Sequence, residues 1–457
     1  MNARQHVSVI GSGFCGTALA IQLLRRANGP LHIQLINRSG RLARGLAYGT
    51  RSSSHLLNVP AGRMSLFAEH PEDFLEFVQT KLPDTNGGDF VTRNLYGDYL
   101  EQRLAEAVAG RGNQTSFEII EEQVVDLTAT NSKVILDLAD GRQLEASQVV
   151  IATGNFTPTV PSSLLSIADD PRFIRDPWTA GAFDSIEQDA RVLMVGSGLT
   201  MFDVALSLQD QNHTGPMLAL SRRALLPQPH RQNIDPPTLP VVPESLTKQT
   251  RIRDLLVGVR QLIKDAQEDG FDWRDIIAAL RPVTPSIWQH LGDTERQRFL
   301  RHLRPYWDVH RHRAAPWIAT RMEQLLQCHQ LEIRASRIRA ATPTQQGLRL
   351  DVQSRSQDQQ THELFDYVIN CTGPCSDVLQ LDDPLLNNLH TRKDVIRDQA
   401  GLGLETTSDY RLIGQFARPH DRLFLLSPML KASHWEAIAV PELRQHAANL
   451  AAQLLKA

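Results

Sequence analysis

Apolar and polar positions along the chain follow two long cycles of strand, glycine turn and helix. In the first cycle an apolar strand over 6–10 runs into a glycine turn, and the apolar spacing that follows predicts a helix over 17–26 and a second strand over 31–37. The same order returns over 191–223. Because strands that alternate with helices are typical of parallel sheets, the pattern predicts an α/β fold with two internally related units.

Each unit also contains a stretch with strand-like alternation. In the first unit we expect an antiparallel meander followed by a buried strand that ends in Ala152-Thr153-Gly154; the four segments are 116–122, 124–130, 133–145 and 148–154. In the second unit the matching segments are 331–341, 347–354 and 366–373, the last of which ends in Cys-Thr-Gly. The repeated ending supports the relation between the two units.

The remaining segments set the expected domain boundaries. Six prolines between 227 and 243 indicate a loop, and residues 246–330 have a helical pattern rich in Trp, Arg and His. We therefore expect a first dinucleotide-binding part over 1–165, a second domain over 188–376 with a helical insertion at 246–330, and the rest of the first domain over 377–457. The tail from residue 434 reads as a carboxy-terminal helix.

Composition narrows the function classes. The chain has 457 residues and a formal net charge of −3, so it offers no global basic excess for nucleic acid or an acidic membrane surface. We find no signal-peptide pattern and no uncharged apolar run of membrane-spanning length. Four cysteines without a C-x-x-C pair predict reduced thiols, no metal site and a cytoplasmic protein. The sequence gives no indication of the oligomeric state.

The first glycine turn carries a complete dinucleotide fingerprint. Gly11 permits the tight turn, Gly13 lets a pyrophosphate approach the backbone, and Gly16 allows helix and strand to pack closely. The helix that follows presents its positive end to the phosphates. At the end of the second strand stands Asn37, where an acid for the ribose hydroxyl is usual. These residues predict a Rossmann-like unit that binds FAD.

The second glycine turn has Gly196 and Gly198 but Met201 in the third position. The turn that faces the pyrophosphate is therefore intact, and only the packing of helix on strand is expected to widen. The next strand ends in Ser221, Arg222 and Arg223, and a guanidinium there suits the 2′-phosphate of NADPH. The alternative is a solvated pair of surface arginines. Two such units predict that hydride passes from a nicotinamide, NAD(P)H, to the flavin.

Several longer motifs resemble bacterial FAD-NAD(P)-binding proteins related to lysine and ornithine N-monooxygenases. They are LARGLAYGT, HLLNVPAGRMSLF, GSGLTMFDVALSL, SRRALLPQPH, YWDVHRHRAAP and WEAIAVPELR. The resemblance implies flavin-dependent oxidoreduction, often monooxygenation, with Asn58 to Met64 near the isoalloxazine and a helix carrying Trp435 behind it. The chain has Ser427-Pro428 and Lys431 where such proteins tend to have Gly-Pro and Arg.

The substrate is the most open question. Residues 306–317 hold His310, Arg311, His312 and Arg313 between aromatic residues, which suits a flat anionic ring. A flavin-dependent urate hydroxylase is one member associated with this group, so urate, oxidised to 5-hydroxyisourate in purine metabolism, is the leading candidate. His310 and Arg313 are its expected catalytic contacts, and Arg63 is expected to stabilise the anionic reduced flavin.

Other interpretations remain. The same segment can be a packed helical surface whose arginines pair with acids such as Asp308, Glu295 or Asp275. An N-hydroxylating amine monooxygenase, an NADPH:acceptor reductase without oxygen insertion and a non-catalytic flavin sensor are the alternative functions. His230 and Arg231 could touch NADPH or flavin, although a lone histidine in a loop is more often structural. Small-molecule substrate and molecular oxygen are the expected partners.

Overall fold

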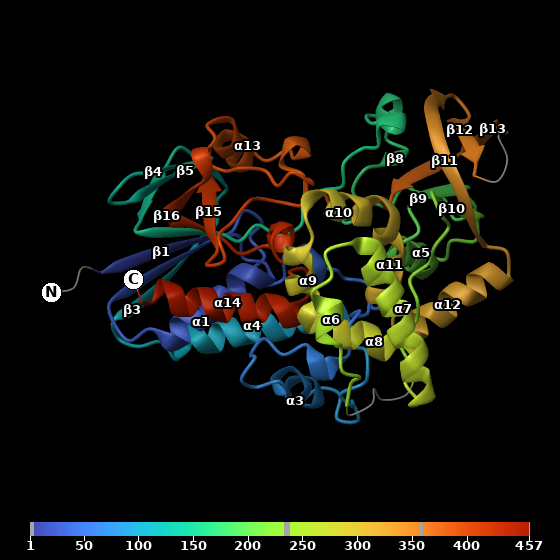
Figure 1. Cartoon of the computed structure of the whole chain (residues 1–457). Helices are drawn as coiled ribbons and strands as arrows, with labels where there is room; N and C mark the ends of the chain where they lie inside the picture. The colour runs from blue at the N-terminus through green and yellow to red at the C-terminus, as the bar shows by residue number, and fades with distance from the viewer. Residues whose placement is uncertain (1–3, 233–237, 356–359, 457) are drawn as a thin grey trace.

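The computed structural model describes residues 4–232, 238–355 and 360–456 and contains two main sheets that lie side by side (Figure 1). The first sheet has the order β15-β16-β7-β1-β2-β3. All its neighbours pair in parallel except β15 and β16. Its strands are β1 (Gln5–Ile10), β2 (Leu31–Ile36), β3 (Thr115–Ile120), β7 (Gln148–Ile151), β15 (Arg411–Gly414) and β16 (Arg418–Leu425).

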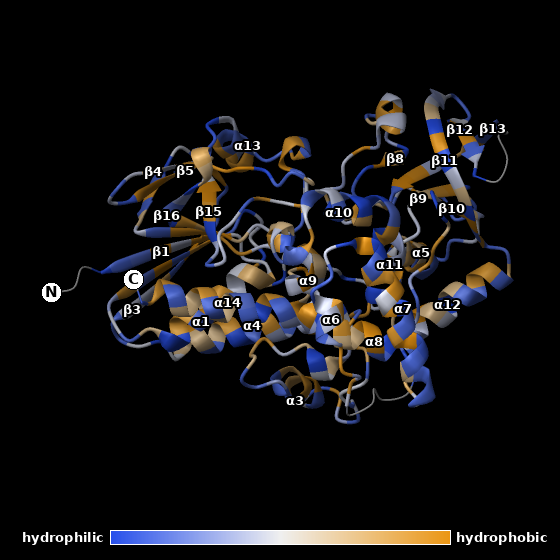
Figure 2. Ribbon diagram, in the orientation of Figure 1, coloured by the Kyte–Doolittle hydropathy of each residue, from blue (hydrophilic) through white to orange (hydrophobic). Residues whose placement is uncertain are grey.

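Helices cover the first sheet, and this packing removes their apolar residues from water. Nearly all of α1 (Phe14–Arg26) is buried, and α14 (Val440–Leu454) packs along it. The helix α4 (Arg93–Ala109) lies on the other side of α1 (Figure 1). In Figure 2 the strands of this sheet are largely orange, as expected for parallel strands buried on both faces.

The second sheet has the order β13-β12-β11-β10-β9-β14-β8. Five of its strands are parallel, in the order β11-β10-β9-β14-β8, and the antiparallel strands β12 and β13 extend the sheet from β11. Its strands are β8 (Phe173–Ile174), β9 (Val192–Val195), β10 (Met217–Ser221), β11 (Leu331–Thr344), β12 (Gly347–Ser354), β13 (Gln360–Phe365) and β14 (Tyr367–Asn370). The predicted α/β class with two Rossmann-like units is confirmed.

A third, small sheet contains the meander of the first unit, and it differs from the expected one. Its strands are β4 (Val124–Ala129), β5 (Val134–Leu138) and β6 (Gln143–Ala146). The segment 116–122 was expected to belong here, but it forms β3, which pairs in parallel with β2. As the last strand of the first sheet, β3 has exposed residues at Glu118 and Ile119 and lacks the continuous buried run of a central parallel strand.

The helical insertion packs around its own apolar clusters in front of the two sheets (Figure 1). Its elements are α6 (Glu244–Thr247), α7 (Ile252–Glu268), α8 (Trp273–Leu280), α9 (Thr284–His290), α10 (Asp293–Arg298), a π-helical turn (Phe299–Leu303) and α11 (Arg304–Arg311). The helix α12 (Pro316–Gln327) instead packs with the core of the second sheet through Ile318, Met322 and Leu325. The expected insertion over 246–330 thus includes a helix that covers the second sheet.

The remaining short helices lie in the first unit. They are α2 (Gly45–Tyr48), α3 (Asp73–Gln79) and α13 (Pro384–Thr391). The expected carboxy-terminal helix begins at Val440 and not at residue 434, because Pro441 occupies the first turn of a helix. No helix among the described residues is long and apolar enough to cross a membrane.

A buried ion pair ties the two units together. Arg93, at the start of α4 in the first unit, donates from Nη2 to Asp203 of α5 (Leu199–Asp210) in the second at 3.0 Å. Both side chains are buried. Arg93 Nε also donates to the carbonyl of Leu56 at 3.0 Å, and His55 Nε2 lies 2.9 Å from Ser207 Oγ on α5. These contacts fix α5 against the segment that precedes the predicted flavin contacts.

We predict that Asp203→Ala lowers the free energy of unfolding by about 3–5 kcal/mol, because it leaves the Arg93 guanidinium buried without its counter-ion. Urea unfolding followed by circular dichroism measures the loss. Asp210→Ala is the matched control on the same helix: Asp210 is exposed and accepts from Ser52 and Ser54, so its loss is expected to cost below about 1 kcal/mol. Equal losses in the two variants would contradict the assignment.

Candidate functional site

The first glycine turn lies where β1 ends and α1 begins. Gly11 has a φ of +108°, and a Cβ there would lie 2.6 Å from the carbonyl oxygen of Ala152. A Cβ on Gly16 would lie 1.8 Å from the carbonyl oxygen of Gly11. Gly13, at the N-cap of α1, meets no such obstacle, since its nearest neighbour would be Gly45 Cα at 3.7 Å. The protein's own packing therefore requires two of the glycines and leaves the third facing open space.

Buried polar atoms around this turn lack partners among the described residues. Asn37 Nδ2, Asn58 Oδ1 and Thr153 Oγ1 are inaccessible to solvent and make no hydrogen bond. Asn37 follows β2 and Thr153 follows β7, so both flank the turn after β1 at the carboxyl edge of the sheet. Such atoms fit a polar ligand, because a buried donor or acceptor is costly when unsatisfied. The arrangement fits the ribose, pyrophosphate and flavin of FAD.

Thr153 was not among the residues singled out from the sequence, although the repeated Thr-Gly ending gave a signal. Its counterpart in the second unit, Thr372, donates from Oγ1 to Asn370 Oδ1 at 2.7 Å. The two threonines occupy equivalent strand ends, but only the Thr372 hydroxyl has a hydrogen-bond partner among the described residues. The open hydroxyl lies in the unit that carries the complete fingerprint.

The second glycine turn repeats the geometry of the first. Gly196 has a φ of +121°, and a Cβ there would lie 2.5 Å from the carbonyl oxygen of Cys371. Gly198 is the N-cap of α5, has no atom near its missing Cβ and provides no side-chain cap. Met201 is fully buried in the core under the second sheet. This turn also leaves the amino end of its helix open to a phosphate group.

The three residues at the end of β10, Ser221, Arg222 and Arg223, make different contacts. Ser221 Oγ accepts from Ser197 Oγ at 2.8 Å and from the backbone N–H of Ala224, so it stabilises the turn itself. Arg223 turns toward the helical insertion, where Nη2 donates to the carbonyl of Arg301 and the guanidinium lies 5.7 Å from the Tyr306 ring. Arg222 is exposed. Of the two arginines, Arg222 is the one available for a 2′-phosphate.

The two units meet at His230, in the loop after β10. His230 Nε2 donates to the carbonyl of Asn58 at 3.0 Å, and its backbone N–H donates to Ala314. Burial, helped by the positive charges of Arg313 and Arg63, lowers the pKa of His230 to about 3. The junction thus joins the segment expected near the flavin to the loop after the strand expected to bind the nicotinamide cofactor.

The remaining flavin candidates lie in the first unit or next to the insertion. Arg63 ends a 3₁₀ turn (Ala61–Arg63) and is exposed. Met64 is buried in the core of the first unit. Trp435 lies in the turn before α14, not in a helix, and it packs at 4.5 Å between ring centroids against Trp288 of the insertion. It therefore links the two parts of the structure.

The cationic segment 306–317 does not form one cluster. His310 Nδ1 lies 2.7 Å from the carbonyl of Tyr306, and its ring packs against Trp273. Arg311 forms a buried ion pair with Glu436 at 2.6 Å. Arg313 is buried and lies close enough to His230 to affect its pKa. The expected catalytic pair of His310 and Arg313 lies beside one ring, that of Trp273, with the Arg313 guanidinium 6.0 Å from the ring centroid, whereas Arg311 is taken up by Glu436.

The acids considered as partners of the segment 306–317 form ion pairs with arginines outside it. Arg231 pairs with Asp275 at 2.5 Å and with Asp272, Arg298 pairs with Glu295, and Arg304 pairs with Asp308 at 3.2 Å. The four cysteines are free thiols, as expected. Burial raises the pKa of the Cys15 thiol to about 12, so it is an inert thiol. Among the described residues no group of His, Cys, Asp or Glu is arranged to hold a metal ion.

Comparison with known proteins supports this two-unit organisation. The model of the FAD-NAD(P)-binding family matches residues 8–156. This part of the chain is an FAD-NAD(P)-binding domain. The comparison with curated proteins found no match.

Solved structures show the same fold over the whole chain. The ornithine hydroxylase of Pseudomonas aeruginosa in its reduced form has 16% identity and a TM-score of 0.65, with 99% of each chain covered. The ornithine N-hydroxylase of Kutzneria sp. 744, with reduced FAD, NADP⁺ and L-ornithine, has 14% identity, a TM-score of 0.65 and 99% coverage of each chain. L-lysine 6-monooxygenase from Pseudomonas syringae has 18% identity, a TM-score of 0.63, and 98% of this chain and 99% of that chain covered.

We predict that Gly13→Ala folds normally but loses FAD. A Cβ at residue 13 meets no close protein atom, whereas it would stand where the pyrophosphate approaches the backbone. Flavin absorbance after reconstitution measures binding, and the thermal midpoint measures folding. Gly29→Ala is the control, since Gly29 also has open space around its missing Cβ and lies outside the turn. A Gly13→Ala protein that holds FAD as tightly as the wild type would contradict the assignment.

We also predict that acid destabilises the protein through its buried histidines. In the unfolded chain a histidine takes up a proton near pH 6.5, whereas His230 stays neutral in the folded state down to about 3. Its stabilising contribution is therefore complete above pH 6.5 and falls by about 2 kcal/mol by pH 5.

Urea unfolding of the wild type and of His230→Gln at pH 7 and pH 5 tests this. The variant keeps a donor for the Asn58 carbonyl but does not titrate, so its stability is expected to change less between the two pH values. His70→Gln, at an exposed position, is expected to behave like the wild type. An identical pH dependence for His230→Gln and the wild type would contradict the prediction.

Proposed function

We propose that the protein is an FAD-dependent, NAD(P)H-dependent monooxygenase that hydroxylates the nitrogen of an amine. The observation that carries this proposal is the pair of open glycine turns, at Gly13 and Gly198, in a chain whose fold follows ornithine and lysine monooxygenases over 98–99% of its length. The overall reaction consumes NADPH, a proton, oxygen and the amine, and it gives NADP⁺, water and the hydroxylamine. Bound FAD would carry the electrons from NADPH to oxygen.

The residues of the chain would bind and orient the reactants. The amino end of α1 and Asn37 would hold the pyrophosphate and ribose of FAD, with Asn58 and Thr153 as further polar contacts. The amino end of α5 and Arg222 would hold NADPH. His230 would remain uncharged and keep the loop after β10 against the Asn58 segment, while Arg63 would favour the anionic reduced flavin.

Urate is no longer the preferred substrate. Within the cationic segment that suggested it, Arg311 is neutralised by a buried ion pair with Glu436. The similar solved structures are described as hydroxylases of ornithine and lysine, and none of the names refers to a purine. Amine N-hydroxylation, first considered as the alternative, therefore takes precedence, and purine metabolism is set aside.

An NADPH-dependent reductase without oxygen insertion is the second candidate. The bacillithiol disulfide reductase of Staphylococcus aureus has 13% identity and a TM-score of 0.55 over 99% of this chain and 98% of that chain. The four cysteines here include no C-x-x-C pair, and Cys15 and Cys371 are buried. A reductase of this chain would therefore need an external acceptor.

The direct test is NADPH oxidation by the FAD-loaded protein in air, with oxygen, peroxide and hydroxylamine measured together across a panel of primary amines. The proposal predicts that at least one amine stimulates oxidation and yields hydroxylamine in place of peroxide. If every amine leaves the rate unchanged and an added disulfide or quinone is reduced instead, the reductase replaces the monooxygenase.

We predict that Arg222→Ala raises the KM for NADPH about tenfold and leaves the KM for NADH nearly unchanged, because only NADPH carries the 2′-phosphate. Steady-state kinetics with both cofactors measure the difference. Arg223→Ala is the paired variant, and since Arg223 bonds to Arg301 we expect it to change the two KM values alike. The role of Arg222 would be excluded if its removal affected both cofactors equally.

A further inference from the structure

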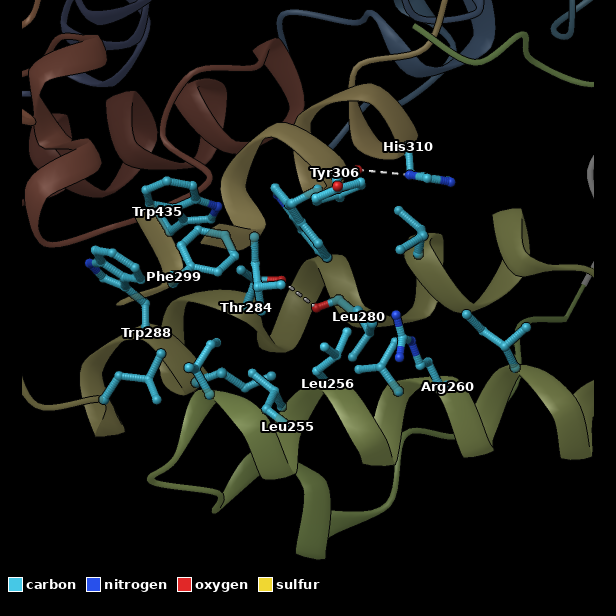
Figure 3. Close-up of a pocket in the computed structure, with 18 of the residues that line it drawn as sticks. Leu255, Leu256, Arg260, Leu280, Thr284, Trp288, Phe299, Tyr306, His310 and Trp435 are labelled. Carbon is cyan, nitrogen blue, oxygen red and sulfur yellow. Dashed lines mark hydrogen bonds between the residues drawn. The ribbon is translucent and has the colours of Figure 1, made fainter. Parts of the chain in front are cut away.

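The helical insertion encloses a cavity that the proposed flavin chemistry does not explain. Its volume is about 680 Å³, within the range of small-molecule sites. The walls come from α7, α8, α9, the π-helical turn and α11, and Trp435 closes one end (Figure 3). The glycine turns and His230 lie outside its lining, whereas His310 and Trp435, which the sequence suggested as substrate and flavin contacts, belong to it.

The walls of the cavity are strongly apolar. Leucine, isoleucine and valine side chains of α7 and α8 form one side, and aromatic rings form much of the other. Trp288 Nε1 donates to the Ala432 carbonyl at 2.9 Å, and Thr284 Oγ1 donates to the Leu280 carbonyl at 2.8 Å, whereas the buried Trp307 Nε1 has no hydrogen-bond partner among the described residues. A ligand that fills this space therefore needs a large apolar body.

The two ends of the cavity differ in character. At one end Trp288, Phe299 and Trp435 pack together, with ring centroids 4.5 Å apart for the two tryptophans and 5.1 Å apart for Phe299 and Trp435. At the other end Arg260 rises from α7 below His310 (Figure 3). The aromatic end favours a hydrophobic chain or ring, and the guanidinium favours an anion.

The charge of the lining points to one class of ligand. Among the described residues that line the cavity none is acidic, and Arg260 forms no ion pair with any described residue. The acids nearest to it along α7 are Asp254 and Asp265, and Asp265 accepts from Gln261 at 2.6 Å. A carboxylate would complement Arg260, whereas an ammonium group at the same place would meet a like charge.

We propose that this cavity binds a hydrophobic monocarboxylic acid, with its carboxylate at Arg260 and its apolar body toward Trp288 and Trp435. The site goes beyond the proposed N-hydroxylation and does not depend on it, because binding requires only the insertion and the Trp435 turn. An ammonium group is expected to bind less well than a carboxylate at the Arg260 end, because the two positive charges repel.

Tryptophan fluorescence provides a direct test, since four of the six tryptophans of the chain line the cavity. The FAD-loaded full chain is titrated with decanoate, decan-1-ol and decylamine, which share one apolar chain and differ in the head group. We expect a saturable change with decanoate at a Kd at least tenfold below that of decylamine, with decan-1-ol between them. The absence of saturable decanoate binding, or equal binding of acid and amine, would overturn the proposal.

Two variants separate the charge from the cavity. Arg260→Met is expected to weaken decanoate binding about tenfold, to the level of decan-1-ol, whereas Arg253→Met, on the same helix but outside the lining, is expected to bind decanoate like the wild type. Leu256→Trp fills the space from α7 and is expected to abolish the binding of both acid and alcohol. Circular dichroism and retained FAD report folding in each variant. Unchanged decanoate binding in Arg260→Met or in Leu256→Trp would contradict the assignment.

The binding test and the enzymatic test can contradict their two proposals independently of each other. A protein that oxidises NADPH with an amine but shows no decanoate binding would keep the proposed function and remove the cavity ligand. Conversely, decanoate binding that depends on Arg260 in a protein without monooxygenase activity would keep the site and remove the proposed function.

Discussion

The buried contact between Arg93 and Asp203 is the constraint on which the arrangement of the two units depends. Each residue is charged, each is removed from water, and each belongs to a different unit. Because an isolated buried charge is costly, the pair favours the relative position of α4 and α5 in which both charges are compensated. This position brings the segment after His55 and the loop that carries His230 to the same junction. Transfer of hydride between two bound dinucleotides needs such a fixed junction, since reaction requires near contact of the reacting atoms.

What the cationic segment can bind depends more on the surroundings of each side chain than on the number of positive charges in the sequence. The sequence places His310, Arg311 and Arg313 within four positions, which suggested a single anion site. The helix α11 ends at Arg311, and within a helix successive residues such as His310 and Arg311 point about 100° apart. Arg311 pairs with Glu436, whereas His310 and Arg313 both lie beside Trp273. The partner Glu436 lies far away in sequence, and no local pattern could have identified it.

Those parts of the fold that depend on local backbone geometry were predictable from sequence. Gly11 and Gly196 adopt positive φ angles and face strand-end carbonyls, and these requirements leave a recognisable pattern of glycines. The strand 116–122 was assigned to the wrong sheet because an edge strand of a parallel sheet has exposed residues and lacks a continuous buried run. Trp435 was expected on a helix, but Pro441 places the helix start after it. The unsatisfied Thr153 hydroxyl and the apolar cavity depend on tertiary packing, which the local sequence does not encode.

The central claim is that two dinucleotides bind at the two glycine turns and exchange hydride. Its most direct test is anaerobic mixing of the FAD-loaded protein with NADPH in a stopped-flow spectrometer. The account predicts bleaching of the flavin absorbance in a single turnover, and it predicts that Gly198→Asp, which places a negative side chain at the open end of α5, abolishes the bleaching while FAD remains bound. Flavin that stays oxidised in the wild type, or reduction that is unaffected in Gly198→Asp, would contradict it.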